Sequence, residues 1–319
     1  MCYSARIEAD YHEYTRLYGA DISIGDFVKL YWNRKEGAKL RIPKALDAAM
    51  LRGDSAEERQ VREWIAQYDA QQATKLEQDL FKQRKRLADA QRTLQVKTTK
   101  AAQESQRIAT DKVAWILGKL ADLRRTALIG EDSRIFPGWY APVLVSEGGR
   151  RVLKPMRYQC RPAGKPAFYD VKFPGTYNAR RDSLEKFWSG QFGVSHGIVV
   201  LNAFFENVSL HTMEHRELAP GEAEQNVVLE FRPRPTQDML VACLWSHWHE
   251  AGSPDLLSFA AITDTPPPEV AAAGHDRCII PIKPEHLDAW LDPDRANLAA
   301  QQAILDDRAR PYYEHRLAA

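Results

Sequence analysis

Residues 197–206 read GIVVLNAFFE, an apolar run that ends on a carboxylate. Its β-branched and aromatic side chains favour a strand. Five other short β-rich runs lie beyond Gly130, at residues 141–145, 227–231, 240–245, 258–263 and 278–281. Turn-forming segments, such as residues 147–149 (EGG) and 265–268 (TPPP), separate these runs. The spacing predicts an α+β fold, with a barrel-like antiparallel or mixed sheet and flanking helices.

A long segment between Gly53 and Gly118 contains neither glycine nor proline. Its small and aliphatic side chains recur every seven residues, a coiled-coil-like pattern carried by Leu80, Leu87, Leu94, Ala101 and Ile108. We expect a hairpin of two helices that turns near residues 96–99, in preference to one straight helix that dimerises. The predicted organisation is a discontinuous domain (1–52 and 129–295), an inserted helical arm (53–128), and a C-terminal helix and tail (296–319).

Composition excludes several classes of protein. No apolar run approaches the roughly 18 residues of a membrane-spanning helix, and charges interrupt the first residues, so we expect neither membrane insertion nor a signal peptide. The four cysteines, Cys2, Cys160, Cys243 and Cys278, are widely scattered and form no CxxC pair. They indicate reduced thiols, a cytoplasmic location, no zinc ribbon and no cofactor.

Cys2 directly follows Met1. Removal of Met1 would leave an α-amine and a thiol on adjacent carbons, a 1,2-aminothiol that internal residues cannot supply. The amine of such a group can condense with an aldehyde, and its sulfur can then close on the imine to give a thiazolidine. Part of the amine is already unprotonated at neutral pH, because the pKa of a free α-amine is about 7.8.

Charge is concentrated in one stretch, although the whole chain carries a net charge of only +1. Residues 150–186 contain ten Lys or Arg against three acids, a formal charge of +7, and five aromatic residues are interleaved with them. Cations with exposed aromatic rings suit a single-stranded nucleic acid, through phosphate neutralisation and base stacking. The alternative is a solvated strip whose aromatic rings point into the core.

Several blocks occur in one order along the chain, after the initial Met-Cys: residues 154–162 (KPMRYQCRP), 177–182 (YNARRD), 201–206 (LNAFFE), 242–245 (ACLW), 274–281 (GHDRCIIP) and 288–291 (DAWL). Together they resemble the SOS response-associated peptidase family, the abasic-site processing proteins. Members of that family begin Met-Cys-Gly-Arg and carry Asn-Ala-Arg, Gly-Phe-Tyr-Glu-Trp and His-x-Arg-Met-Pro blocks. The resemblance covers about residues 1–20 and 134–293 and leaves the helical arm outside.

The resemblance implies a protein that crosslinks itself to abasic sites in single-stranded DNA during the DNA-damage response. Cys2 would be the nucleophile, Glu206 the general acid and base, and His275 a donor to the opened sugar. Asn178 would position Cys2 or the sugar. The implied contacts to DNA come from Arg157, Tyr158, Arg161 and Arg180. The expected location is cytoplasmic, at the nucleoid when DNA is bound. Three roles stay open for the arm: it could grip duplex DNA, associate with a second copy, or bind a protein partner in replication or repair.

The chain departs from the family blocks at four places. Tyr3-Ser4 stand for Gly-Arg, Tyr158 and Asn207 each stand for Trp, and Cys278-Ile279 stand for Met-Pro. Two other functions stay open: an N-terminal-nucleophile cysteine peptidase or amidase, and an assembly protein with an inert core. Residues 211–215 (HTMEH) fit a zinc motif that requires a helix, but their polar surroundings favour a loop without metal.

Overall fold

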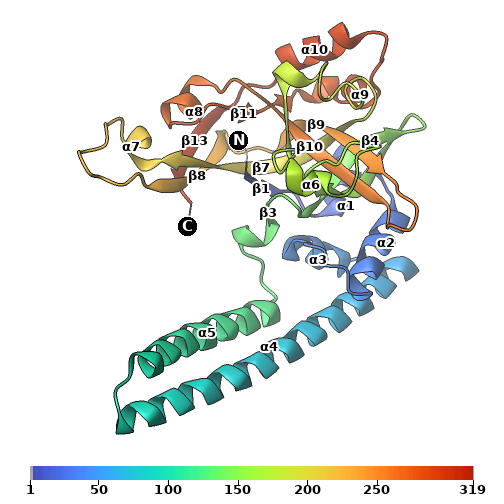
Figure 1. Cartoon of the computed structure of the whole chain (residues 1–319). Coiled ribbons are helices and arrows are strands. Elements are labelled where there is room, and N and C mark those ends of the chain that lie inside the picture. The colour runs from blue at the N-terminus through green and yellow to red at the C-terminus, as the bar shows by residue number, and fades with distance from the viewer. Residues whose placement is uncertain (1–2, 319) are drawn as a thin grey trace. The chain divides into compact units, whose positions relative to one another are not determined.

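The computed structural model describes residues 3–318, and it divides into two compact units (Figure 1). The first unit comprises Met1–Leu30, Lys39–Gly53 and Ile129–Ala319, and the second comprises Tyr31–Ala38 and Asp54–Leu128. Among the described residues, no helix combines the length and the apolar character that a membrane span requires. We describe each unit by itself.

The first unit is built on one large mixed sheet, which confirms the α+β prediction. All six runs predicted from the sequence are strands or pairs of strands. The strands are β1 (Ser4–Ile7), β2 (Asp21–Ile22), β3 (Arg134–Ile135), β4 (Tyr140–Glu147), β5 (Arg150–Tyr158), β6 (Asn178–Arg180), β7 (His196–Ser209), β8 (Asn226–Arg234), β9 (Met239–Trp248), β10 (Leu256–Asp264), β11 (Cys278–Ile279), β12 (Pro281–Ile282) and β13 (Tyr312–Leu317).

The sheet curls into a ring of strands that is not a true barrel. The pairings run from β7 through β9, β10, β5 and β4 and return to β7. Two joints are weak: β5 pairs with β10 in parallel over two residues, and β4 meets β7 only at Leu144 and Ile198. A closed barrel needs continuous ladders with a fixed stagger between all neighbours. The barrel-like expectation therefore holds only for the order of the strands.

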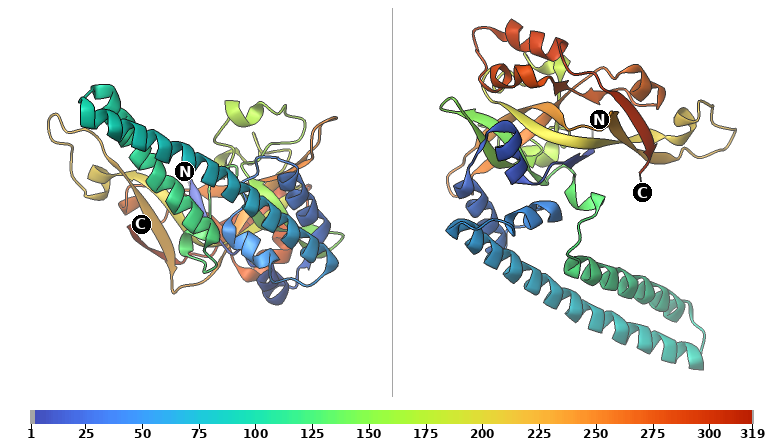
Figure 2. Two further views of the ribbon diagram at one scale, coloured as in Figure 1. Left: turned by 90° about the horizontal axis from the view of Figure 1, so that it is seen from below. Right: turned by 180° about the vertical axis from the view of Figure 1, so that it is seen from behind.

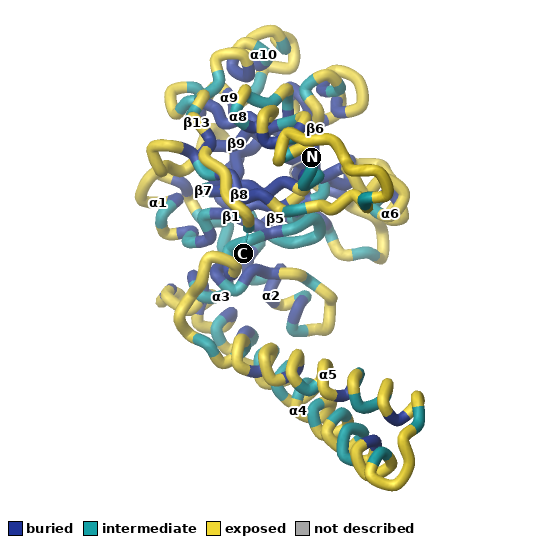
Figure 3. Tube along the Cα trace, turned by 90° about the vertical axis from the view of Figure 1, so that its left-hand side faces the viewer, coloured by how far each residue is buried: buried dark blue, intermediate teal, exposed yellow. Residues whose placement is uncertain are grey.

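Strand β7 is the centre of this unit, because it pairs with β1, β4, β8 and β9. Its first ten residues are buried except for Asn202, as Figure 3 shows by colour. Gly197 lies where neighbours crowd the backbone: a Cβ there would be 3.0 Å from Val143 Cγ1 and 3.2 Å from Cys243 Sγ. The buried Trp290 donates its indole N–H to the carbonyl of Gly197 at 3.0 Å. The run that predicts the fold is thus its innermost strand.

Short helices flank the sheet. They are α1 (Tyr11–Tyr18), α2 (Ile24–Lys35), α3 (Lys44–Met50), α6 (Tyr169–Lys172), α7 (Leu210–Met213), α8 (Pro268–Ala272), α9 (Leu287–Leu291) and α10 (Leu298–Asp306), with 3-10 turns η1 (Gly130–Ser133), η2 (Arg181–Ser183) and η3 (Pro284–His286). The tail after α10 forms β13, which pairs with β8 along six residues. The sequence analysis assigns no strand there, because the segment is too polar to show one.

The second unit is a helical hairpin of α4 (Ala56–Val96) and α5 (Lys100–Arg124), and Figure 2 shows the two helices side by side from two further directions. Ser55 and Glu58 form a capping box at the start of α4, and Thr99 caps α5. The hairpin prediction is confirmed, with the turn where the sequence places it. Small and aliphatic side chains fill the seam, among them Ala90, Ala102, Ala109, Ile116 and Leu120.

The seven-residue repeat does not continue unchanged through the turn. Ala101, expected in the seam, is exposed, whereas its neighbour Ala102 is buried. Three extended residues, 97–99, interrupt the helix. On α5 the buried positions include Ala102, Ala109 and Ile116, one residue later than the repeat predicts. One residue corresponds to about 100° around a helix, because an α-helix has 3.6 residues per turn.

We predict that Ala109→Leu destabilises the hairpin by about 1–3 kcal/mol, because an added isobutyl group overpacks a closed seam. The matched change Ala101→Leu, on the exposed side of the same helix, should have an effect within about 0.5 kcal/mol. Hydrogen–deuterium exchange of α4 and α5 measures both. Equal protection in the two variants would contradict this packing.

Candidate functional site

Glu206 lies near the end of β7, and its side chain is fully buried. Strand pairing fixes its surroundings, since Ser4 of β1 lies opposite Phe205 and Leu229 of β8 lies opposite Glu206. Burial disfavours the charged form of a carboxyl group. It raises the pKa of Glu206 to about 8, so that the group holds its proton at neutral pH.

His275 is the direct partner of this carboxyl group. It follows α8 and Gly274, whose φ of +93° provides the left-handed turn that leads into the loop before β11. His275 Nδ1 lies 2.8 Å from the carbonyl of Arg277, and Nε2 lies 3.1 Å from Glu206 Oε2. Burial also lowers the pKa of His275. Because a carbonyl only accepts, we assign the proton to Nδ1, which leaves Nε2, the nitrogen nearer to Glu206, without a proton.

Asn178 is the first residue of β6, which runs parallel to β10. The residue is 6% exposed, and neither its side-chain oxygen nor its nitrogen has a hydrogen-bond partner among the described residues. A buried amide without partners is costly and often marks a site where a ligand binds. Its neighbour Tyr177 packs edge-on against Tyr3, with ring centroids 6.4 Å apart. Asn178 thus lies on the segment that approaches the start of β1.

Arg134 holds the first residue of β1 in place. Its guanidinium donates from Nε and Nη2 to the hydroxyl of Ser4, at 3.1 and 3.0 Å. The same group lies 3.7 Å from the ring centroid of Phe205, the residue before Glu206. Ser4 is itself fully buried. Arg134 is not among the residues predicted from the sequence. The one related signal is Ser4, which stands where the family block has Arg; in the structure Arg134 brings a cation to this position.

Cys2, the predicted nucleophile, lies outside the described residues. Among the other three predicted catalytic residues, Glu206 and His275 are in contact.

Three of the residues expected to contact DNA are engaged inside the protein. Arg157 and Arg161 both form ion pairs with Asp170, and Arg161 also stacks on Trp248. Tyr158 is 2% exposed and stacks on Phe259. Their partners come from other elements, Asp170 from α6 and Phe259 from β10, and composition does not reveal such contacts. In this arrangement the ring of Tyr158 is covered, and the two guanidinium groups have an acid partner already.

The remaining surface of the basic stretch is more open. Arg180 is half-exposed and forms an ion pair with Asp182 at 2.6 Å. It lines a polar hollow of about 230 Å³, whose arginines (Arg180, Arg181 and Arg277) lie among three aspartates (Asp182, Asp264 and Asp276). Two of its lining residues are close in sequence to the candidate site: Arg180 follows Asn178 by two residues, and Arg277 follows His275 by two. Near α6, the rings of Phe168 and Phe173 are exposed. The other three aromatic residues of the basic stretch, Tyr158, Tyr169 and Tyr177, are buried. Only two of the five interleaved rings are therefore exposed, as a surface for stacking requires.

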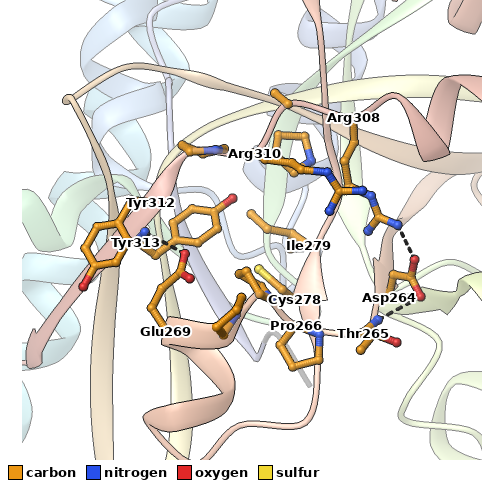
Figure 4. Close-up of a pocket in the computed structure, with 15 residues that line it drawn as sticks. Asp264, Thr265, Pro266, Glu269, Cys278, Ile279, Arg308, Arg310, Tyr312 and Tyr313 are labelled. Carbon is orange, nitrogen blue, oxygen red and sulfur yellow. Dashed lines mark hydrogen bonds and ion pairs between the residues drawn. The ribbon is translucent and has the colours of Figure 1, made fainter.

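A second hollow, of about 480 Å³, lies between the segment after β10 and the segment before β13 (Figure 4). Its acids have partners, since Arg308 pairs with Asp264 and the backbone N–H of Tyr313 donates to Glu269 at 3.0 Å. Burial raises the pKa of the Cys278 thiol, which points into it, far above the ordinary value. This hollow therefore offers neither an unpaired acid nor a thiol that ionises readily.

The segment of the zinc-like motif does not form the helix that such a motif requires. Helix α7 is a single turn that ends at Met213, and His215 lies beyond it with φ of +53°. Within residues 3–318, no group of three His, Cys, Asp or Glu side chains is arranged to hold a metal ion.

The buried carboxyl group predicts a pH dependence of stability. An unfolded Glu ionises near pH 4.5, whereas folded Glu206 keeps its proton to about pH 8. The unfolded state therefore binds fewer protons in this window, and the free energy of unfolding falls as pH rises. Glu206→Gln removes this loss, so the Tm of the variant minus that of wild type should increase from pH 5 to pH 9, by about 2 °C or more. The exposed control Glu285→Gln should show a flat difference, and a flat difference for both would contradict a protonated Glu206.

Comparison with known proteins agrees with the order of the blocks. The family model described as SOS response associated peptidase (SRAP) matches residues 98–318, which include Asn178, Glu206 and His275 but not Cys2. No curated protein matches the chain. Similar solved structures include a protein from Bordetella bronchiseptica (14% identity, TM-score 0.46, covering 59% of this chain and 87% of that one).

Two further solved structures are similar at the same level. One is a protein from Bacteroides thetaiotaomicron (13% identity, TM-score 0.45, 60% of this chain and 80% of that one). The other is a phage-related protein from Bordetella bronchiseptica (17% identity, TM-score 0.43, 61% and 85%). Because the family model covers more than half of the sequence, the chain belongs to the SOS response associated peptidase family.

Proposed function

We propose that this protein crosslinks its N-terminal Cys2 to the ring-opened form of an abasic site in single-stranded DNA. The observation that carries the proposal is the buried pair of Glu206 and His275, which lie 3.1 Å apart. Glu206 belongs to β7, which pairs with the first strand of the chain, β1. A carboxyl group that keeps its proton near neutral pH can act as a general acid or, after losing it, as a general base. Family membership supports a role in the DNA-damage response.

The chemistry has two bond-forming steps. The α-amine of Cys2 would attack C1 of the sugar aldehyde, and the carbinolamine would lose water with a proton supplied by Glu206 to give an imine. The thiol would then add its sulfur to the imine carbon, while its proton passes to the nitrogen, which closes the thiazolidine. Ring closure within one residue is unimolecular, and good alignment is worth up to about 7–11 kcal/mol. His275 would exchange the proton with Glu206.

Other residues would hold the DNA. The unpartnered amide of Asn178 would bind the hydroxyl groups of the opened sugar. Arg180 and Arg277, which line one polar hollow, would bind the phosphates on either side of the lesion, since the guanidinium fork matches a phosphate group. Phe168 and Phe173 would stack on unpaired bases.

The family description also names a peptidase, and a cysteine beside an acid–base pair can attack an acyl carbon. In that second candidate function the same Cys2 thiol would form an acyl-enzyme and DNA would play no part.

The crosslink is tested by mixing purified protein with a single-stranded oligonucleotide that carries one abasic site. We expect a band of higher mass that survives heat and denaturant, is absent with Cys2→Ala, and forms about 10²–10⁴ times more slowly with Glu206→Gln. An oligonucleotide without the lesion is the control. Cleavage of peptide substrates that requires Cys2, with no band on abasic DNA, would favour the peptidase.

Arg134 should act as a positioning residue for the same reaction. We expect Arg134→Gln to slow crosslinking about tenfold, because Ser4 loses both N–H donors and β1 loses its anchor. Ser4→Ala should slow it similarly, and the double variant should be no slower than either one, since both changes break one interaction. Arg232→Gln, a half-exposed arginine on β8, is the control. Additive effects, or an unchanged rate, would show that this contact does not position the nucleophile.

A further inference from the structure

The end of the helical hairpin is the most basic part of the arm. Residues 82–100 contain seven Lys or Arg and one acid, Asp89, a formal charge of +6. We call this segment the basic tip. It comprises the last turns of α4, the connecting residues 97–99 and the first residue of α5. The rest of the arm, in contrast, nearly balances its charges.

The cations of the basic tip are largely available to a ligand. Arg84, Lys85, Lys97 and Lys100 are exposed, and within residues 3–318 none of these four forms an ion pair with a carboxylate. The other cations near them have partners, such as Lys82 with Asp79 at 3.2 Å and Arg92 with Asp89 at 2.8 Å. The free charge is thus concentrated around the turn.

Side-chain hydroxyl groups lie beside these cations, because the hairpin brings the start of α5 next to the end of α4. A shallow hollow of about 570 Å³ lies between the helices at the tip. Its polar lining comprises the cations Lys82, Lys85 and Arg86, the hydroxyl groups of Thr93, Thr99 and Ser105, and one acid, Asp89, which pairs with Arg92. Arg86 donates from Nε to the Ser105 hydroxyl at 2.9 Å, which ties the two helices together. Cations and hydroxyl groups together are the side chains that most often contact phosphates.

We propose that the basic tip binds the phosphate backbone of double-stranded DNA. Residues 82–112 contain no aromatic side chain, so they offer nothing on which the bases of a single strand could stack. A duplex hides its bases and presents about one phosphate charge per 1.7 Å of its axis, which suits a rigid cationic rod. A second copy of the tip would repel the first, because both carry the same charge.

This inference goes beyond the proposed crosslinking and does not depend on it, because the duplex need not contain a lesion. It assigns to the arm a contact that is independent of sequence and sensitive to salt.

The test measures binding of the full-length protein to a fluorescent, undamaged 30-base-pair duplex by anisotropy at several salt concentrations. The variant Lys85→Gln/Lys97→Gln/Lys100→Gln removes three free charges from the tip. The control Lys39→Gln/Lys75→Gln/Lys112→Gln removes three exposed charges elsewhere, so that the net charge is the same. Both variants should keep the helical circular dichroism of wild type.

We expect the tip variant to bind the duplex about tenfold or more weakly at 100 mM salt, with a slope of log K against log salt reduced by up to about 2.7. The control variant should bind almost as well as wild type. Equal affinity and slope for the tip and control variants would overturn the proposal. So would an equal loss on a single-stranded 30-mer, or retained binding with a change in oligomeric state. Crosslinking to a purely single-stranded abasic oligonucleotide should be the same in all three proteins, which separates this outcome from failure of the proposed function.

Discussion

The burial of one carboxyl group constrains the rest of this structure. Glu206 lies in the central strand β7, whose neighbours in the sheet at this end are β1 and β8. Its side chain is fully buried, and burying a charged carboxylate there would be costly. The fold meets this constraint by keeping the group protonated and by placing His275 within hydrogen-bonding distance. The imidazole in turn needs the left-handed turn at Gly274 and the carbonyl of Arg277.

Apolar patterning was enough to predict the strands that are buried on both faces, because their sequences are almost continuously hydrophobic. It failed for β5, where Lys154 interrupts the pattern. The ammonium group of Lys154 forms ion pairs with Asp26 and Glu147, at 3.1 and 2.7 Å. Both acids lie outside β5, so the sequence of the strand does not show how its charge is compensated. It failed for β13 in the same way, since five of its six residues are exposed and the strand exists only through its partner β8.

The candidate site was predictable to a similar extent. Glu206, His275 and Asn178 are recognised by their blocks, and the first two are in contact. All three of Arg157, Arg161 and Arg180 have an acid partner, and they differ in exposure: the side chain of Arg180 is 50% exposed, against 16% and 10% for Arg157 and Arg161. Charge and aromatic content do not reveal this difference, because it arises only on folding. The role of Arg134 could not be predicted for the same reason, because its partner Ser4 lies 130 residues away in the sequence and becomes its neighbour only on folding. Its guanidinium supplies a cation beside the position where the family block has Arg, and it couples the start of the chain to Phe205.

The central claim is that the processed N-terminal cysteine forms the covalent bond to DNA. Intact-mass spectrometry before and after incubation with an abasic oligonucleotide tests it in one measurement, because it reports both removal of Met1 and the adduct. The account predicts a protein without Met1 and, after incubation, a species whose mass is the sum of protein and oligonucleotide less one water. A protein that retains Met1, or one that lacks it and gives no adduct, would contradict the account.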